Sequence, residues 1–90
     1  MPPDIKNDIL PSQCRAARAL LGWSQDALEQ ASSVAKKTIA DFERGARQPY
    51  ARTLADIRTA LEQAGVIFIA SNGEGPGVRL RRQDDASETP

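Results

Sequence analysis

Four short segments with the apolar spacing of helices follow one another between residues 11 and 65, and they constrain the fold of this 90-residue chain more than any other feature. In each segment apolar side chains recur every three or four residues, which is the period of an amphipathic α-helix. Gly22, the turn over 32–34, Gly45 and Gly65 end the four segments. A chain of this length holds one domain and little more, so the helices must share one core.

The apolar positions predict which side of each helix faces that core. The expected helices span 13–21, 24–31, 35–44 and 53–64. Pro11 suits the first turn of the first helix. Ser12, Ser24 and Thr53 are placed to cap three of the helices, because a side-chain oxygen can accept from a free amide of the first turn. The expected inward-facing residues are Cys14, Ala17, Leu21, Leu28, Ala31, Ile39, Phe42, Leu54, Ile57, Leu61 and Ala64.

Composition excludes several classes of protein. Twelve basic and twelve acidic residues cancel, which excludes a polycation that binds by bulk charge but allows a locally basic face. The chain has no His and one Cys, Cys14, so we expect no disulfide framework, no zinc site and no enzyme of the Ser-His-Asp kind. A lone thiol fits a reducing cytosol, and the longest apolar run, 66–70, is too short to span a membrane. No cofactor, metal or small-molecule ligand is expected.

The chain changes character after the fourth helical segment. Residues 66–69 are β-branched and aromatic, 72–77 predict a turn, and 78–81 alternate, which together indicate a β-hairpin or two strands. The fold class is therefore mainly α, with four helices and a C-terminal pair of strands. The expected organisation is a lead-in over 1–10, a helical domain over 11–65, strands over 66–82 and a disordered acidic tail over 83–90.

Both faces of the first strand are apolar, which indicates a dimer. Val66, Phe68 and Ala70 point to one face, and Ile67 and Ile69 to the other. A lone hairpin on four helices cannot bury both faces, whereas pairing with a second subunit would do so. The expected interface consists of Val66, Ile67, Phe68, Ile69, Val78 and Leu80. In the alternative, the hairpin folds back on the fourth helix of its own chain.

A specific pattern runs through the second and third helical segments. It reads Leu-Gly-Trp-Ser-Gln at 21–25, Lys-Lys-Thr-Ile at 36–39 and Phe-Glu-Arg-Gly at 42–45, with Leu28, Val34 and Pro49. This pattern resembles the Cro/C1-type (XRE-like) helix-turn-helix family of phage and bacterial repressors, and the resemblance covers about 13–65. It implies a four-helix, lambda-repressor-like domain that binds double-stranded DNA in the bacterial or phage cytoplasm, at the nucleoid when bound.

The resemblance also implies which residues contact DNA. Lys36, Lys37 and Asp41 match base-reading positions of the family, and Ala40 leaves room for the groove or for a thymine methyl group. Lys donates to guanine and Asp accepts from cytosine, which indicates a G·C-containing half-site. The positions that match phosphate contacts are Gln25, Thr38, Arg44, Arg47 and Tyr50. In the alternative to phosphate contact, Arg47 and Tyr50 are loop residues exposed to solvent.

The start of the third helix, taken together with the family pattern, favours DNA contact. Ala35 offers no capping oxygen, and Lys36 and Lys37 put two cations at the positive end of the helix dipole, which costs about 0.3–1 kcal/mol each. A DNA phosphate or guanine edge would supply the missing negative partner. In the alternative, both lysines are solvated or Ser33 caps the helix.

Four further positions concern structure rather than DNA. In the family, the positions of Arg18 and Glu43 form a partly buried ion pair between the first and third helices. Glu29 stands where the family usually has Ala. Ser33 stands where it usually has Gly, so we expect a positive φ that strains an L-residue by about 1–2 kcal/mol.

These observations predict a sequence-specific transcriptional regulator, acting as a dimeric repressor that reads a pseudo-palindromic operator in the major groove. In the second hypothesis, the protein is a DNA-binding antitoxin or anti-activator that binds a partner protein through its C-terminal strands. A third, an enzyme, finds no supporting constellation of residues.

Overall fold

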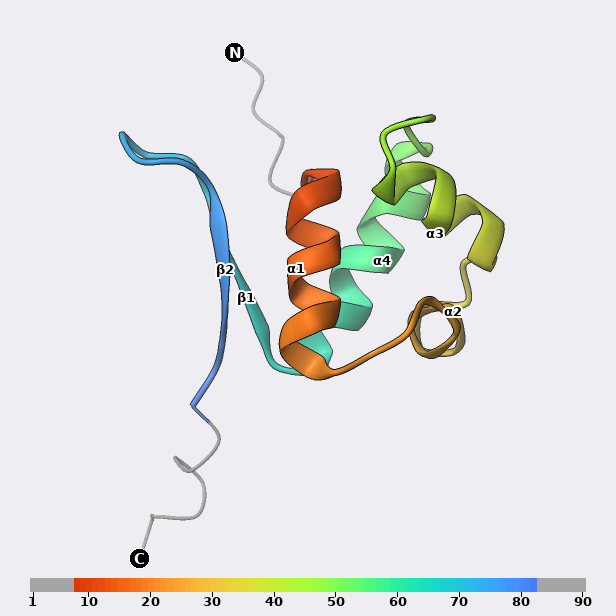
Figure 1. Ribbon diagram of the computed structural model, residues 1–90, viewed down its shortest axis with the longest axis horizontal. Helices are drawn as coiled ribbons and strands as arrows, with labels where there is room; N and C mark the ends of the chain where they lie inside the picture. Colours follow the sequence, from red (N-terminus) through yellow and green to blue (C-terminus); the bar gives the residue numbers. More distant parts are fainter. Residues whose placement is uncertain (1–7, 83–90) are drawn as a thin grey trace, which may run out of the picture.

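A computed structural model describes residues 8–82, and over this range four helices are followed by one antiparallel pair of strands (Figure 1). The elements are α1 (Pro11–Leu21), α2 (Gln25–Ser32), α3 (Lys36–Glu43), α4 (Ala51–Gln63), β1 (Val66–Ile69) and β2 (Gly77–Leu80). The expected fold class is confirmed. The tail over 83–90 and most of the lead-in over 1–10 lie outside the described residues, so the predicted disorder of the tail stays a prediction.

The start of α1 differs from the prediction that Ser12 caps it. Pro11 is the first helical residue and Leu10 is the N-cap. The backbone N–H of Leu10 donates to Oε1 of Gln13 at 2.9 Å. Pro11 suits the first helical position because proline has no backbone N–H, and an N–H at this position would have no partner within the helix. The helix therefore begins before Ser12, which lies inside it.

One of the other two predicted caps is confirmed and one is wrong. Oγ of Ser24 accepts from the N–H of Ala27 at 3.0 Å and starts α2. By contrast, α4 begins at Ala51 with Tyr50 as N-cap and no side-chain cap, so Thr53 lies inside the first turn.

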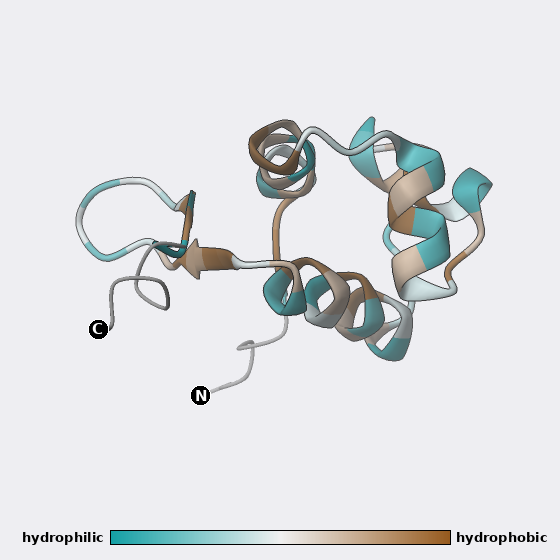
Figure 2. Cartoon of the chain, turned by 90° about the horizontal axis from the view of Figure 1, so that it is seen from below, coloured by the Kyte–Doolittle hydropathy of each residue, from teal (hydrophilic) through white to brown (hydrophobic). Residues whose placement is uncertain are grey.

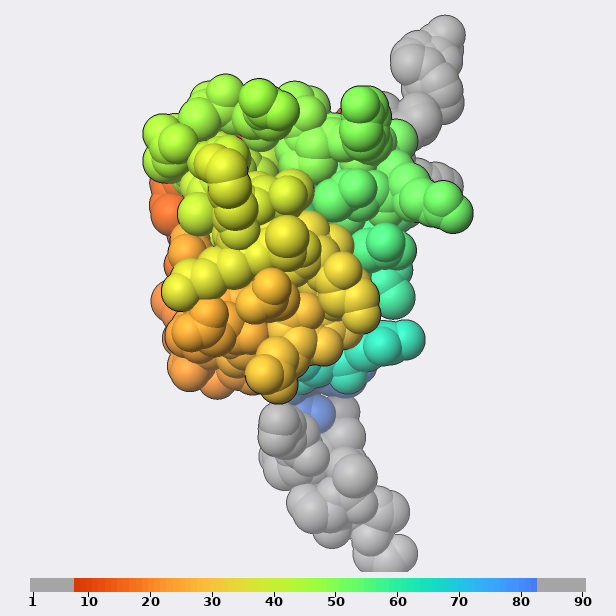
Figure 3. Space-filling model, turned by 90° about the vertical axis from the view of Figure 1, so that its right-hand side faces the viewer, coloured from red at the N-terminus to blue at the C-terminus, as the bar shows by residue number. Residues whose placement is uncertain are grey.

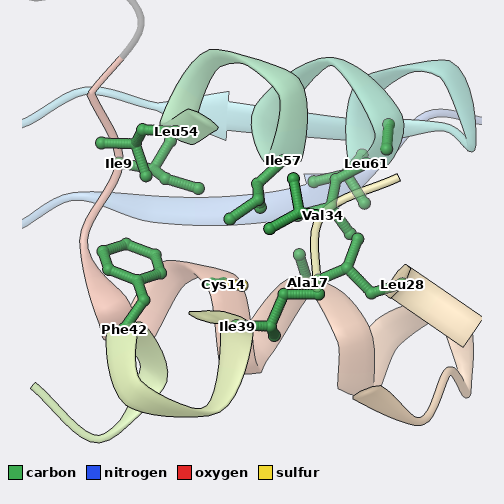
Figure 4. Packing of buried hydrophobic residues seen from close by; sticks show 12 residues of the cluster. Ile9, Cys14, Ala17, Leu28, Val34, Ile39, Phe42, Leu54, Ile57 and Leu61 are labelled. Atoms are coloured by element: carbon green, nitrogen blue, oxygen red, sulfur yellow. The ribbon is translucent and has the colours of Figure 1, made fainter. Parts of the chain in front are cut away.

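The core lies where the helices face one another, and Figure 4 shows its side chains pointing together from all four helices. The buried apolar residues are Ile9, Cys14, Ala17, Leu28, Val34, Ile39, Phe42, Leu54, Ile57, Ala60, Leu61 and Val66. Of the predicted inward residues, Leu21 and Ala64 are half-buried. The helical period therefore located most of the core from sequence.

The prediction that Ala31 faces inward is wrong. Ala31 is exposed, and its neighbour Ser32 is buried in its place. Burial of a serine is tolerated because its hydroxyl is satisfied twice: it donates to the carbonyl of Leu28 at 2.7 Å and accepts from the N–H of Val34 at 3.1 Å.

The hairpin packs against α1 and α4, away from α2 and α3 (Figure 1). In its register Val66 faces Leu80 and Phe68 faces Val78, and this face of the sheet packs on the helical core. Val66 is fully buried. Figure 2 shows the strands as hydrophobic and the turn that joins them as hydrophilic. One face of the hairpin is thus buried within its own chain, which corrects the expectation that a second subunit must cover both.

Two side chains attach the hairpin to the helices. Nε2 of Gln13 donates to the carbonyls of Gly77 at 3.0 Å and Ile69 at 3.4 Å. The guanidinium of Arg58 on α4 lies 5.2 Å from the ring centre of Phe68. Both contacts hold the sheet in place beside α1 and α4.

Candidate nucleic-acid interface

α2 and α3 are joined by a tight turn in which Ser33 has a left-handed backbone. Its φ is 65°, and its N–H donates to the carbonyl of Glu29 at 2.8 Å, which ends α2. Val34 is buried directly after it and anchors the turn to the core. The expected positive φ at Ser33 is confirmed, and this residue sets where α3 begins.

One side of α3 is locked in the core and the other is open. Ile39 and Phe42 are fully buried. Lys36 and Lys37 are exposed, and Asp41 is half-buried on the outer side. Figure 3 faces the side of the molecule on which α2, α3 and the loop after α3 lie together. The helix therefore presents charged side chains to solvent from a rigid support.

The carboxylate of Asp41 on α3 pairs with two basic side chains, Lys37 on the same helix and Arg44 directly after it. Oδ2 of Asp41 lies 3.5 Å from Nζ of Lys37, and Oδ1 lies 2.9 Å from Nη2 of Arg44. The hydrogen bond from Arg44, helped by the charge of Lys37, holds the pKa of Asp41 below its ordinary value. Asp41 is therefore a carboxylate at neutral pH and available as an acceptor.

The prediction that the start of α3 lacks any negative partner is wrong. Ala35 is the N-cap and provides no side-chain oxygen, as expected. Oε2 of Glu29, however, accepts from the backbone N–H of Lys36 at 3.2 Å, and Oδ1 of Asp26 lies 3.0 Å from its Nζ. Asp26 and Glu29 stand three residues apart on α2, which puts them on one side of that helix. The sequence shows that the two acids share one side of α2, but only the fold shows that this side of α2 faces α3.

The five candidate phosphate contacts fall into two groups. Thr38, Arg47 and Tyr50 line one cavity of about 540 Å³ between the start of α3 and the start of α4. Tyr50 is 86% exposed. Gln25 and Arg44 lie outside that cavity. Nε2 of Gln25 donates to Oε1 of Glu43 at 3.0 Å, so this amide nitrogen already has a partner within the chain.

Arg18 and Glu43 meet beneath α3. Nε and Nη2 of Arg18 each lie 2.7 Å from a carboxylate oxygen of Glu43, an arrangement with two parallel hydrogen bonds. Nη1 of Arg18 also donates to the carbonyl of Trp23 at 2.9 Å. The carboxylate of Glu43 raises the pKa of Arg18, mainly through the hydrogen bonds.

Glu43 also receives contacts from two more side chains. Sγ of Cys14 donates to Oε2 at 3.1 Å, while Arg15 hydrogen-bonds the backbone carbonyl of Glu43. Burial by itself would raise the pKa of the Glu43 carboxyl, but hydrogen bonds from Arg18, Gln25 and Cys14 outweigh it and hold the pKa below its ordinary value. Burial, and then the hydrogen bond to Glu43, raises the pKa of the Cys14 thiol. Residues of α1 and α2 thus converge on the last residue of α3.

Two further findings concern the described part of the chain. Among residues 8–82, no group of three or more His, Cys, Asp or Glu side chains could hold a metal ion. No helix in that range has the length and apolar character needed to cross a membrane.

Two short helices joined by a left-handed turn, with the second presenting polar side chains outward, define a helix-turn-helix DNA-binding protein. The family model described as helix-turn-helix, of the Cro/C1 (XRE) type, matches residues 15–63, which is more than half of the chain. The chain belongs to this family of DNA-binding transcription regulators. No curated protein matches it. The match extends from the second turn of α1 to the end of α4, so the hairpin lies beyond it.

Proposed function

We propose that the protein is a dimeric repressor that works in the cytoplasm and reads a pseudo-palindromic operator by placing α3 in the major groove. The observation that supports this most is the two-sided character of α3. Ile39 and Phe42 hold its inner side in the core, while Lys36, Lys37 and Asp41 face outward. A recognition helix needs this rigid support, because base contacts depend on small distances and fixed angles.

The outward residues of α3 favour a G·C-containing half-site. Lys37 donates to guanine O6 and N7, and Asp41, as a carboxylate, accepts from cytosine N4. Ala40 is half-buried between them and leaves room for the edge of the groove. Thr38, Arg47 and Tyr50, around their shared cavity, contact the flanking phosphates.

The dimer is proposed through the outer face of the hairpin. Of the six interface candidates, Val66 is buried in its own chain, and Phe68, Val78 and Leu80 pack against its core. Ile67 and Ile69 remain for a second copy. Ile67 is 37% exposed, and each strand of the two-stranded sheet has one edge that pairs with no strand among the described residues. Edges and apolar faces of this kind are covered by a second subunit in many symmetric dimers.

Selection of bound sites from random DNA, followed by footprinting of the best site, tests this function. We expect two inverted half-sites with G·C pairs, their centres about 34 Å or a multiple apart, one for each α3 of the dimer. Protein with both Lys37→Ala and Asp41→Asn serves as the control and should enrich no such site. Enrichment of no sequence by the natural protein would overturn the proposal.

A second candidate function rests on the same sheet edges. An exposed edge can accept an added strand from another protein, as an antitoxin or anti-activator would require. Purification from the native cell distinguishes the two functions. A stoichiometric partner that is lost when Ile67 is replaced by Glu would favour the antitoxin or anti-activator.

A further inference from the structure

Two acidic residues of α2 lie against the start of α3. Oε2 of Glu29 accepts from the backbone N–H of Lys36 at 3.2 Å. Oδ1 of Asp26 lies 3.0 Å from Nζ of the same lysine. The first amide of α3 and its first cationic side chain are therefore both bound by carboxylates of the neighbouring helix.

These are the two groups with which the start of α3 would attract an anion. Free amides and the positive end of the helix dipole favour negative charge, and a lysine beside them adds a full positive charge. The Lys36 and Asp26 side chains are 53% and 66% exposed, so DNA can reach this pair. A phosphate that approaches Lys36 competes with Asp26 for its charge and is repelled by Glu29.

We propose that Asp26 and Glu29 act as an intramolecular competitor of DNA phosphate at the start of α3, and so limit the affinity of the protein for the DNA backbone. This inference rests on the proposed function, because it requires α3 to approach DNA. When Lys36 exchanges the carboxylate of Asp26 for a DNA phosphate, it gains little net attraction, because it is paired with an anion before and after binding. A lysine that is already paired also adds less to the release of counterions on binding.

The proposal separates these two acids from Asp41. Asp41 also pairs with cations, Lys37 and Arg44, but it lies on α3 itself and is a candidate for base contact. Asp26 and Glu29 lie on α2, and the contacts they make to α3 are directed to Lys36. Their removal should therefore change binding to any duplex, whatever its sequence.

The test compares Asp26→Asn and Glu29→Gln with Glu74→Gln, measuring Kd for a random-sequence duplex over a series of salt concentrations. Glu29→Gln keeps an oxygen for the N–H of Lys36, so the start of α3 remains capped. Glu74 is exposed in the turn between β1 and β2, away from α3, and its replacement changes the net charge equally. Glu74→Gln should melt like the natural protein, and the two α2 variants should lose no more stability than the small amount that an exposed ion pair contributes.

We expect each α2 variant to bind random DNA about two- to fivefold more tightly, the range that corresponds to an exposed ion pair. For Asp26→Asn the slope of log K against log salt should steepen by about 0.9, because the released Lys36 neutralises one more phosphate. Glu74→Gln should show neither change. In a Lys36→Ala background the gain from Asp26→Asn should disappear.

The inference is overturned if Asp26→Asn and Glu29→Gln bind the random duplex with the same affinity and salt slope as Glu74→Gln. That result would leave the proposed function unaffected. A gain from Asp26→Asn that persists in the Lys36→Ala background would also overturn the inference. If the natural protein binds neither random nor selected duplexes, the proposed function fails, and the inference fails with it.

Discussion

The guanidinium of Arg18 and the carboxylate of Glu43 face each other through two hydrogen bonds of 2.7 Å, which join the last turn of α1 to the last residue of α3. The Glu43 side chain is 4% exposed and that of Arg18 19%. The pair therefore fixes the end of α3 from the inside, while the outer side of the helix remains free to meet DNA.

Arg18→Ala should lower the free energy of unfolding by about 3 kcal/mol, the lower end of the range for breaking a buried pair, since Arg18 keeps some exposure. The cost arises because the Glu43 carboxylate is left buried without its main partner. Denaturant unfolding measures the loss. Arg79→Ala, on the exposed side of β2, is the control and should change stability by less than about 0.5 kcal/mol. Equal stability of the two variants would contradict the structural role of the pair.

The stability gained from Glu43 should depend on pH in a defined direction. Its pKa in the folded protein lies below the value of about 4.3 expected in the unfolded chain, so the folded state holds the proton less readily. Its contribution is then fully present above that value and is lost as the pH falls through the lowered folded pKa. Unfolding of the natural protein and of Glu43→Gln between pH 7 and pH 3 measures this. We expect a constant difference above about pH 5 that shrinks below about pH 4; a difference that grows in acid would refute the assignment.

Lys37→Ala should weaken binding to the selected operator by about 1–3 kcal/mol and relax the preference at one base pair, whereas Lys36→Ala should weaken it less, because Asp26 already pairs with Lys36. Stability should change by less than about 0.5 kcal/mol, because both lysines are exposed. Affinity measured on operator variants and on random DNA separates base reading from phosphate contact. Equal losses on both kinds of DNA would mean that the two lysines contact phosphates only.

Ser33→Gly should raise the free energy of unfolding by about 0.5–1 kcal/mol. Ser33 has a φ of 65°, which strains an L-residue by about 1–2 kcal/mol, and the greater freedom of glycine in the unfolded chain takes back part of that gain. Ser33→Ala keeps the strain and serves as the comparison. If the glycine variant melts no higher than the alanine variant, backbone strain does not limit the turn.

Ile67→Glu should convert the proposed dimer to a monomer while the fold remains intact, because Ile67 lies on the outer face of the hairpin. Sedimentation of the two proteins at matched concentrations, with Ile67→Val as the conservative control, measures the change. Natural protein that sediments as a monomer would refute the proposed dimer.

Removal of the chain after Gly65 should destabilise the helical domain rather than release an intact monomer. Val66 is fully buried, and the helix-facing side of the hairpin packs on the core. A loss of about 2 kcal/mol or more is expected, since burial of each large apolar side chain contributes about 1.5–3 kcal/mol. A truncated protein as stable as the full chain would show that the hairpin adds nothing to the domain.

Local signals in the sequence predicted the helices, the turn and the hairpin. Ser24 caps α2 because a cap depends on a few neighbouring residues, whereas the left-handed backbone at Ser33 was implied by the resemblance to a family that usually has Gly there. Ser12 and Thr53 failed as caps for a related reason: several nearby residues could start each helix, and Pro11 and the chain at Tyr50 start them earlier. The spacing of apolar residues identified most of the core. It chose Ala31 where Ser32 is buried, because these residues lie three and four positions after Leu28 and the helical period allows either to face inward.

By itself, then, the sequence determined the order of elements, which follows from the period of adjacent apolar residues. Its resemblance to the helix-turn-helix family implied the left-handed turn at Ser33 and the helix that carries the candidate base contacts. Only the tertiary structure decided which face of the hairpin is covered and which acids meet Lys36. The spacing of Asp26 and Glu29 put both on one side of α2, but their partner depends on how α2 and α3 cross. That crossing depends on how Leu28 of α2 and Ile39 of α3 pack in the shared core, which the spacing of residues along one helix does not specify.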